Sequence, residues 1–430
     1  MKKFILLLAC ALSLPGVHAV AAQDTGMALR LEDAQRIALD SNHDLRLALT
    51  ALRNAQAGVR SADVGPNPLL TLQTININPS QGVGGGSLRN KAVDTTVRID
   101  QQIERGGKRA LRVENAQLLE QAARNDLGDV RRQMRLAVAQ AYYDLLEAQE
   151  RRDIVRETAS LYDRTREAAV QRRKAGDIAG ADVARVEVDA LRAANDVNQV
   201  EAEVRRAQQT LSLALGGLAG TTDLRATDAW PVADPDLAYE AMADAAIGNR
   251  ADIRAAEARV RAADAALRLA LSLRTRDVTV GVQAEHWPQN GANNQGSGNS
   301  VGISIQIPLF LQNQFTGEIR SAQAAADNAS VALEKVRAAA RGELIVSASD
   351  ARQAAIRLRR YDTELLAASA KSADAAEYAF RNGAAGVMDV LDARRTRRAT
   401  LLEAAAARAD HAKALAAWEA AKSNASGDQP

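Results

Sequence analysis

Two aspartates near the C-terminus, Asp389 and Asp392, have the type and spacing that most suggest chemistry. On a helix, residues three apart lie on one face about one turn apart, so the two carboxylates would form a negative patch that attracts cations. Two solvated helix aspartates beside Arg394 and Arg395 would account for the same sequence. The spacing indicates a candidate cation-attracting site, with that plainer alternative open.

A second candidate is the run IERGGKR, which joins an expected strand to an expected helix. Its glycines, Gly106 and Gly107, permit a sharp redirection of the chain because glycine tolerates positive φ. We expect the charged members Glu104, Lys108 and Arg109 to be solvated at this junction. An ordinary strand-to-helix turn explains the run as well, so the run is not interpreted as a chemical site.

Other reactive residue types give no cluster. The histidines His18, His43, His286 and His411 are far apart in the sequence, so they form no visible set of metal ligands. Cys10 is the sole cysteine, and a chain without it has no disulfide or thiolate metal site. No phosphate-binding loop or nucleophile elbow is present. We therefore expect no catalysis, no cofactor and no resident metal.

The N-terminus has the features of an export signal over residues 1–22. Lys2 and Lys3 supply the positive start, and Phe4–Leu14 forms an apolar core before small residues that suit cleavage. About eleven apolar residues are too few to span a bilayer, which disfavours a membrane anchor. Lipid attachment at Cys10 is another open alternative. Beyond residue 23 no apolar run is long enough for a spanning helix.

An internal duplication organises the rest of the chain. Leu31–Arg46 resembles Tyr239–Arg254, VRIDQQI lines up with VGISIQI, and two glycine-containing runs also align, at offsets of about 204 to 208 positions. We expect a first repeat over 23–220, a turn-rich linker over 221–236, a second repeat over 237–423 and a C-terminal tail over 424–430.

Each repeat reads as helix, two strands, very long helix and shorter helix. The expected helices cover 31–64, 108–174 and 182–215, then 237–273, 317–382 and 387–423. The long helices contain no proline, and roughly 66 residues would extend about 100 Å. Such a rod suits a coiled, tubular or fibrous assembly. The expected fold class is mainly α with a small β part.

Period-two alternation predicts four strands. It is clear in Val97–Ile103, Val278–Glu285 and Val301–Ile307, and it slips at Thr74 within Leu69–Ile77. The pattern fits a water-filled membrane barrel and equally an antiparallel sheet on a soluble core. Four strands cannot close a barrel, and open edges are not tolerated in lipid. In a membrane, several chains would have to share one barrel.

The exported, duplicated plan resembles the TolC family of outer-membrane efflux factors over about Leu29 to Ser423. The resemblance implies a homotrimer in which four strands per chain build a shared transmembrane β-barrel of twelve strands, above a periplasmic α-helical barrel. The run IERGGKR is similar to the I-E-x-G-G-K-R signature of the family's heavy-metal branch, typified by the outer component of cobalt–zinc–cadmium exporters. The second repeat has Leu309–Gln314 in its place.

The resemblance also assigns roles at the periplasmic tips, where a glycine turn joins the long and shorter helices and meets an adaptor protein. The matching adaptor-contact residues are Gly176, Asp177, Ile178, Gly383, Ala384 and Ala385. Asp389 and Asp392 match aspartates that form acidic rings at the closed entrance, which makes them a candidate periplasmic gate. Ala385 stands where some relatives have an arginine that latches this entrance.

The implied function is a passive outer-membrane channel that exports heavy-metal cations and reaches into the periplasm. It would be joined by a periplasmic adaptor to an inner-membrane pump of the resistance–nodulation–division type. Two alternatives are a channel for multidrug efflux or type I protein secretion, and a soluble periplasmic coiled-coil scaffold. A net charge of +2 gives no reason to expect a nucleic-acid partner.

Overall fold

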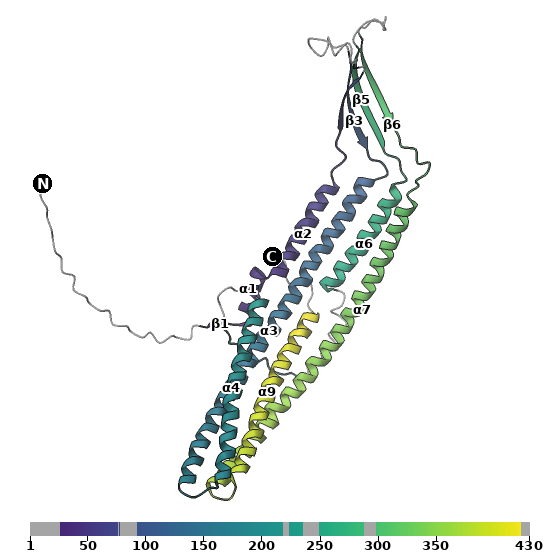
Figure 1. Cartoon of the computed structure of the whole chain (residues 1–430). Coiled ribbons are helices and arrows are strands. Elements are labelled where there is room, and N and C mark those ends of the chain that lie inside the picture. The colour runs from purple at the N-terminus through teal and green to yellow at the C-terminus, as the bar shows by residue number, and fades with distance from the viewer. Residues whose placement is uncertain are drawn as a thin grey trace, which may run out of the picture.

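The computed structural model describes residues 26–75, 77, 93–217, 223–234, 249–287 and 298–422. The predicted signal with Cys10, residues 237–248 and the predicted tail lie outside the described residues. The helix expected over 237–273 was wrong at its described start, because Arg250 is extended and α6 begins only at Ala251. Figure 1 shows an elongated molecule with a sheet at one end and two helical hairpin tips at the other.

The elements follow the expected order in each half. The helices are α1 (Leu31–Ser41), α2 (His43–Ala62), α3 (Lys108–Lys174), α4 (Gly180–Ala214), α6 (Ala251–Ser272), α7 (Thr316–Arg360), α8 (Leu366–Arg381) and α9 (Val387–Lys422). The strands are β1 (Met27–Leu29), β2 (Leu69–Ile75), β3 (Asp94–Ile103), β4 (Leu224–Ala226), β5 (Val278–Trp287) and β6 (Gly298–Gln306). At 67 residues, α3 extends about 100 Å and confirms the predicted rod.

The helix expected over 31–64 is divided into α1 and α2, so that prediction was wrong in its continuity. Asn42 adopts an extended conformation between them, and its side-chain oxygen accepts hydrogen bonds from Asp44 N at 2.9 Å and Leu45 N at 3.2 Å. An asparagine in this position caps a helix because it satisfies backbone N–H groups that have no intrahelical partner.

The second long rod is also interrupted, although it was expected to be continuous over 317–382. Helix α7 passes into a π-helical turn, Tyr361–Leu365, and then into α8. Tyr361 Oη donates to Glu403 at 3.3 Å, and Asp362 pairs with Arg408 at 2.9 Å, so the turn is tied to α9. A π turn accommodates an inserted residue within an otherwise α-helical rod.

The linker expected over 221–236 contains a strand that the sequence pattern did not predict. Strand β4 pairs in parallel with β1, which joins the start of the first repeat to the connection between the repeats. Tyr142 of α3 is buried beneath this pair. Its hydroxyl donates to Leu29 O and accepts from Thr227 N and Asp228 N, each at 3.0 Å. Burial raises the pKa of Tyr142 to about 12, which keeps the hydroxyl a donor.

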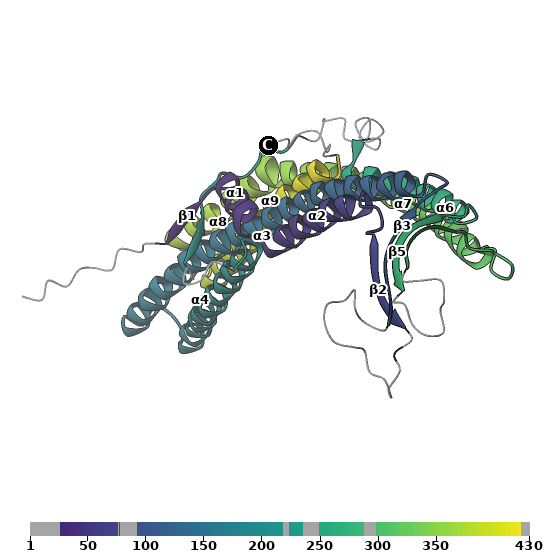
Figure 2. The same cartoon turned by 90° about the horizontal axis from the view of Figure 1, so that it is seen from above.

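The helices form a curved layer, as Figure 2 shows from above. Helix α3 packs against α2, α4, α6 and α9, and α6 also packs against α7. On α6 the buried alanines Ala255, Ala258, Ala262 and Ala265 recur at helical spacing. Small side chains at these positions let the helices approach closely, which accounts for the high alanine content that favoured long helices.

The remaining strands form an antiparallel sheet in the order β2-β3-β5-β6. The register aligns apolar rows on one face, for example Leu72, Val97, Ala284 and Val301. The other face carries polar rows, such as Thr71, Arg98, Gln283 and Gly302. The alternation predicted for β3, β5 and β6 is therefore confirmed. In β2 the alternation slips at Thr74, as expected, because the register places Thr74 on the apolar face and Ile75 on the polar face.

Candidate functional site

The junction between β3 and α3 turns at the two predicted glycines. Gly106 has φ 72° and Gly107 has φ 70°, a region that side chains other than glycine seldom adopt. A Cβ added to Gly106 would lie 2.8 Å from Cβ of Thr275, which belongs to the second repeat. The first glycine therefore also lets the two repeats make close contact.

Lys108 is buried at this junction, with 7% of its surface exposed. Its Nζ donates to Asp277 Oδ1 at 2.7 Å and to Thr275 O at 2.8 Å. Arg105 N also donates to Asp277 Oδ1, at 2.9 Å. Burial acts to raise the pKa of Asp277, but the bonds from Lys108 and Arg105 N outweigh it and hold that pKa below its usual range. Lys108 thus joins the start of α3 to the entry of β5.

The other charged members of the run differ from one another in exposure. Glu104 is half-buried and forms a two-point pair with Arg112, at 2.5 and 3.0 Å, which lowers the pKa of Glu104. Arg109 is exposed and pairs with the exposed Asp63 at 3.0 Å. The prediction that these charges are solvated was wrong for Lys108 and Glu104, because Lys108 pairs with Asp277 of the second repeat and Glu104 pairs with Arg112 in α3.

At the opposite end, the two tips close with the same backbone pattern. After α3, Gly176 has φ 85° and Asp177 N bonds to Arg172 O at 2.9 Å. After α8, Gly383 has φ 76° and Ala384 N bonds to Ala379 O at 2.8 Å. A left-handed glycine followed by this six-to-one bond ends a helix sharply. The remaining tip residues, Ile178 and Ala385, are half-buried.

Asp389 and Asp392 lie on the first turns of α9, and both are exposed. Asp389 Oδ2 accepts a hydrogen bond from Gly386 N at 2.9 Å, so this carboxylate also caps the helix. Among the described residues, neither aspartate forms an ion pair. No described cation therefore neutralises their charges, and the structure places them about one helical turn apart.

The arginines next to these aspartates join the two hairpins instead. Arg394 pairs with Glu377 of α8 and donates to Thr165 Oγ1 of α3 at 2.7 Å. Arg395 pairs with the buried Asp189 of α4 at 2.5 Å. Both guanidinium groups are directed to other carboxylates, so neither arginine pairs with Asp389 or Asp392. The exposure of the two aspartates fits the plainer alternative of solvated helix residues as well as a cation-attracting patch.

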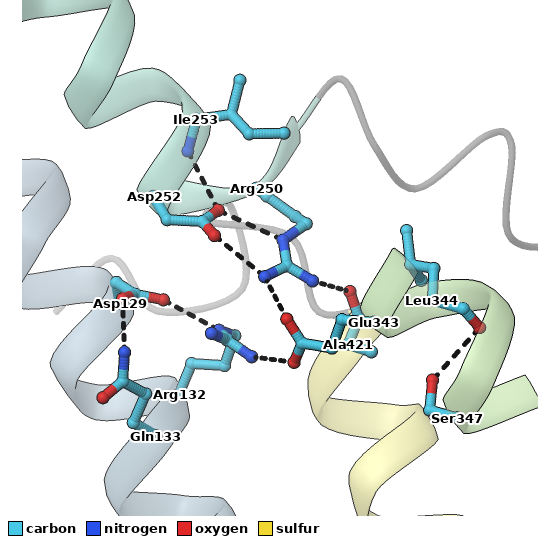
Figure 3. A network of polar contacts seen from close by, with 10 residues as sticks. All are labelled: Asp129, Arg132, Gln133, Arg250, Asp252, Ile253, Glu343, Leu344, Ser347 and Ala421. Carbon is cyan, nitrogen blue, oxygen red and sulfur yellow. Dashed lines mark hydrogen bonds and ion pairs between the residues drawn. The ribbon is translucent and has the colours of Figure 1, made fainter. Parts of the chain in front are cut away.

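At mid-length, a buried arginine connects three helices of the second repeat (Figure 3). Arg250 is 1% exposed, bonds through Nε and Nη2 to Asp252 at 3.1 and 2.8 Å, and pairs with Glu343 of α7 at 2.7 Å. Its Nη1 donates to Ala421 O at the end of α9, at 3.0 Å. A buried guanidinium needs such complete pairing because desolvation without partners is costly.

The network extends to α3 in the first repeat. Arg132 donates to Glu343 Oε1 at 3.0 Å and to Asp129 Oδ1 at 2.9 Å. The first repeat has a smaller counterpart of Arg250: Asn42, at the equivalent aligned position, donates to Ala214 O at the end of α4, at 3.1 Å. Each repeat thus uses the residue two positions before an Asp-Leu/Ile-Arg motif to hold the end of its last helix. The alignment of the two repeats pairs these positions, but it did not indicate this role.

Other kinds of site are not found in the parts of the chain that the structure describes. No group of three or more histidine, cysteine, aspartate or glutamate side chains could hold a metal ion there. None of the helices described is both long and apolar enough to cross a membrane. His411 is buried on α9, and its pKa is lowered by burial.

Each half of the described chain carries one pair of strands on long helices, and this arrangement is that of outer-membrane channel proteins. The model of the family described as outer membrane efflux protein matches residues 35–217 and 242–421, one segment in each repeat. The chain belongs to this family. It is a protein of the bacterial outer membrane that extends into the periplasm.

Individual relatives agree with the family match. The cobalt-zinc-cadmium resistance protein CzcC of Cupriavidus metallidurans is 27% identical over 394 residues, covering 88% of this chain and 89% of that protein. The outer-membrane channel OprN superposes with a TM-score of 0.72 at 25% identity, covering 91% of this chain and 89% of the other. CusC has the same fold, with a TM-score of 0.74 at 17% identity and 92% of each chain covered. The predicted resemblance to the heavy-metal branch is confirmed.

Proposed function

We propose that this chain forms a homotrimeric, passive efflux channel. The supporting observation is the four-stranded sheet, whose apolar face is exposed in the single chain: Leu72, Val301 and Ile303 are 70%, 78% and 77% exposed. Strands β2 and β6 are the edges of this sheet. Lipid can cover the apolar face, but unpaired edges in lipid leave backbone groups without hydrogen bonds. Edges from three chains pairing in a ring would satisfy them.

The helices complete the path in this proposal. Rods of about 100 Å would carry the bore from the barrel across the periplasm. The tip residues around Gly176 and Gly383 are exposed and would meet a periplasmic adaptor, which connects the channel to an inner-membrane pump of the resistance–nodulation–division type. The pump supplies the energy, and the channel conducts without catalysis.

Heavy-metal cations are the proposed cargo. The name of the relative CzcC refers to cobalt, zinc and cadmium resistance, and that relative matches 88% of this chain. The exposed carboxylates of Asp389 and Asp392 fit a cationic cargo, because three copies of each would raise the local concentration of cations at the entrance.

Channel formation is tested by membrane fractionation, chemical cross-linking and conductance in planar bilayers. We expect the mature protein in the detergent-extracted membrane fraction, a cross-linked species of three chains, and stepwise conductance. A monomer that stays soluble in plain buffer, with no conductance, would overturn the proposal and favour a periplasmic scaffold.

The cargo is tested separately, by deleting the gene in its own host and measuring tolerance. We expect reduced tolerance to cobalt, zinc or cadmium ions, restored by the wild-type gene. Loss of tolerance to drugs with unchanged metal tolerance would contradict the metal cargo and leave the channel proposal standing.

A further inference from the structure

One cluster on the polar face of the sheet has no role in the function described so far. Arg98 of β3 lies flat over two neighbouring strands, with 22% of its side chain exposed, beside Asp100 with 15% exposed. On an isolated sheet face open to solvent, a long charged side chain would ordinarily extend into water. The Arg98 side chain instead lies close against the polar face of the sheet.

The contacts of Arg98 explain this position. Its Nε donates to Asp100 Oδ1 and Oδ2 at 2.9 and 2.8 Å. Its Nη2 donates to Ser304 Oγ of β6 at 2.9 Å, and its Nη1 reaches Gln283 Oε1 of β5 at 3.5 Å. A planar guanidinium with several donors is suited to this arrangement because its donors diverge within one plane. The side chain therefore crosses from β3 over β5 to β6.

A glycine makes room for this crossing. A Cβ added at Gly281 of β5 would overlap Oδ1 of Asp100, would lie 2.5 Å from Oγ of Ser304, and would lie 3.1 Å from Nη2 of Arg98. Glycine within a strand costs stability and often marks a close approach by another group. Here the approaching group is the Arg98–Asp100 pair, which occupies the space above Gly281.

We infer that the Arg98–Asp100 pair is a selectivity-determining element of the bore. The pair lies over Gly281, so this part of the barrel wall carries no net charge. Asp100 also keeps the Arg98 guanidinium from extending into the pore, where its positive charge would repel cations. The inference rests on the proposed function, because it takes the polar face of the sheet to line the pore. Charged rings in a pore set which ions pass.

Other charges on the same face support a path for cations. Glu285 of β5 accepts from Gln283 Nε2 at 2.9 Å and from Ser300 Oγ at 3.3 Å, and the alternation of β3 also places Asp94 on this face. With Arg98 neutralised by Asp100, these carboxylates leave the face acidic. In a trimer each charge is present three times, so loss of one partner would change the local potential strongly.

The test uses charge substitutions with opposite expected signs. Asp100→Asn frees the positive charge of Arg98, and the cation-to-anion permeability ratio from reversal potentials should fall. Arg98→Gln frees the negative charge of Asp100, and the ratio should rise. The double variant R98Q/D100N should return close to wild type. A purely structural role would move both single variants in the same direction, which would overturn the inference.

A thiol probe reports on the barrel wall independently of the periplasmic tips. Gln306→Cys places one thiol on the same face of β6, two residues from Ser304 and within roughly 7 Å of it. The mature protein in liposomes is treated from outside with methanethiosulfonates carrying a cationic or an anionic group. The ratio of the two reaction rates should shift about tenfold toward the anionic reagent in D100N, and toward the cationic reagent in R98Q.

The controls separate folding and channel formation from selectivity. Gly281→Ala should lift the pair and reduce conductance, while the matched glycine variant Gly58→Ala, at a position with open space around it, should not. Asp33→Asn removes an exposed helical ion pair with Arg36 and should leave both readouts unchanged. Absence of conductance in wild type would overturn the proposed function. Wild-type conductance with rate ratios unchanged in D100N and R98Q would overturn this inference alone.

Discussion

At the sheet end of the rods, Lys108 is buried and joins the two repeats through Asp277, whereas at the tip end Asp389 and Asp392 are exposed and have no ion-pair partner among the described residues. The hairpins near the tips are connected mainly by arginines of α9, which reach the partly exposed Glu377 and Asp196 and the buried Asp189. Buried, fully paired charges resist separation, and exposed pairs contribute little. The comparison indicates one end built to stay fixed and another able to rearrange.

The largest effect should follow from Lys108→Ala. This change leaves Asp277 largely buried without its cation, so the free energy of unfolding should fall by about 3 kcal/mol. Denaturant unfolding of the purified protein in detergent, followed by circular dichroism, measures it. The matched control is Arg109→Ala, next in the chain, whose partner Asp63 is exposed. It should cost less than about 1 kcal/mol. Equal losses would contradict the contrast between buried and exposed pairs.

A smaller and more local effect is expected from the double variant R394A/R395A. Removing the contacts to Glu377, Thr165 and Asp189 should speed amide hydrogen exchange in α8 and the start of α9, with little change near β3 and β5. The control is Arg397→Ala, which contacts an exposed aspartate at 3.6 Å. Exchange that rises equally at both ends of the molecule would contradict the assignment of flexibility to the tips.

Acidification should weaken the junction between β3 and α3. The pKa values of Glu104 and Asp277 are lower in the folded protein than in the unfolded chain. Their contribution to stability is therefore complete above the unfolded pKa, about 4, and is lost as pH falls through the folded values. Unfolding measured from pH 6 downward should show this decline in wild type. In K108A, where Asp277 has lost its main partner, the decline should be smaller.

The smallest effect on stability is expected from D389N/D392N, because neither carboxylate is buried and asparagine can still cap the helix. Unfolding should change by less than about 0.5 kcal/mol. Block of single channels by divalent cations should weaken, in contrast, by about tenfold. Asp153→Asn, at another exposed helical aspartate, serves as the control. Unchanged block would remove the two aspartates as a gate.

Features set by local sequence were predicted well. The expected bounds of the long helix, 108–174, are those of α3, and the turns fall at Gly176 and Gly383 as expected. Period, propensity and glycine depend on neighbours within a few residues, so the sequence alone carries them. The alternation of β3, β5 and β6 was predicted for the same reason.

Features that join distant segments were missed. Lys108 meets Asp277 across 169 positions, Arg250 meets Ala421 across 171, and β1 pairs with β4. No local pattern marks such partners, because the residues around a charged side chain in the sequence do not reveal whether it is solvated or paired in the interior. The break at Asn42 was also missed, although a local signal marks it. A helix-capping residue before an acidic helix start was a local signal that could have divided the first helix.

The π-helical turn at Tyr361–Leu365 makes the two long rods mechanically unequal. Regular α-helix resists bending evenly along its length, whereas a rod with an inserted residue concentrates curvature where its hydrogen-bond ladder changes step. The first rod, α3, is continuous, so it resists bending along its whole length. The second rod can bend at the π-helical turn, where Tyr361 and Asp362 bond to α9. The helix beyond this turn, α8, can therefore move together with α9 as one unit.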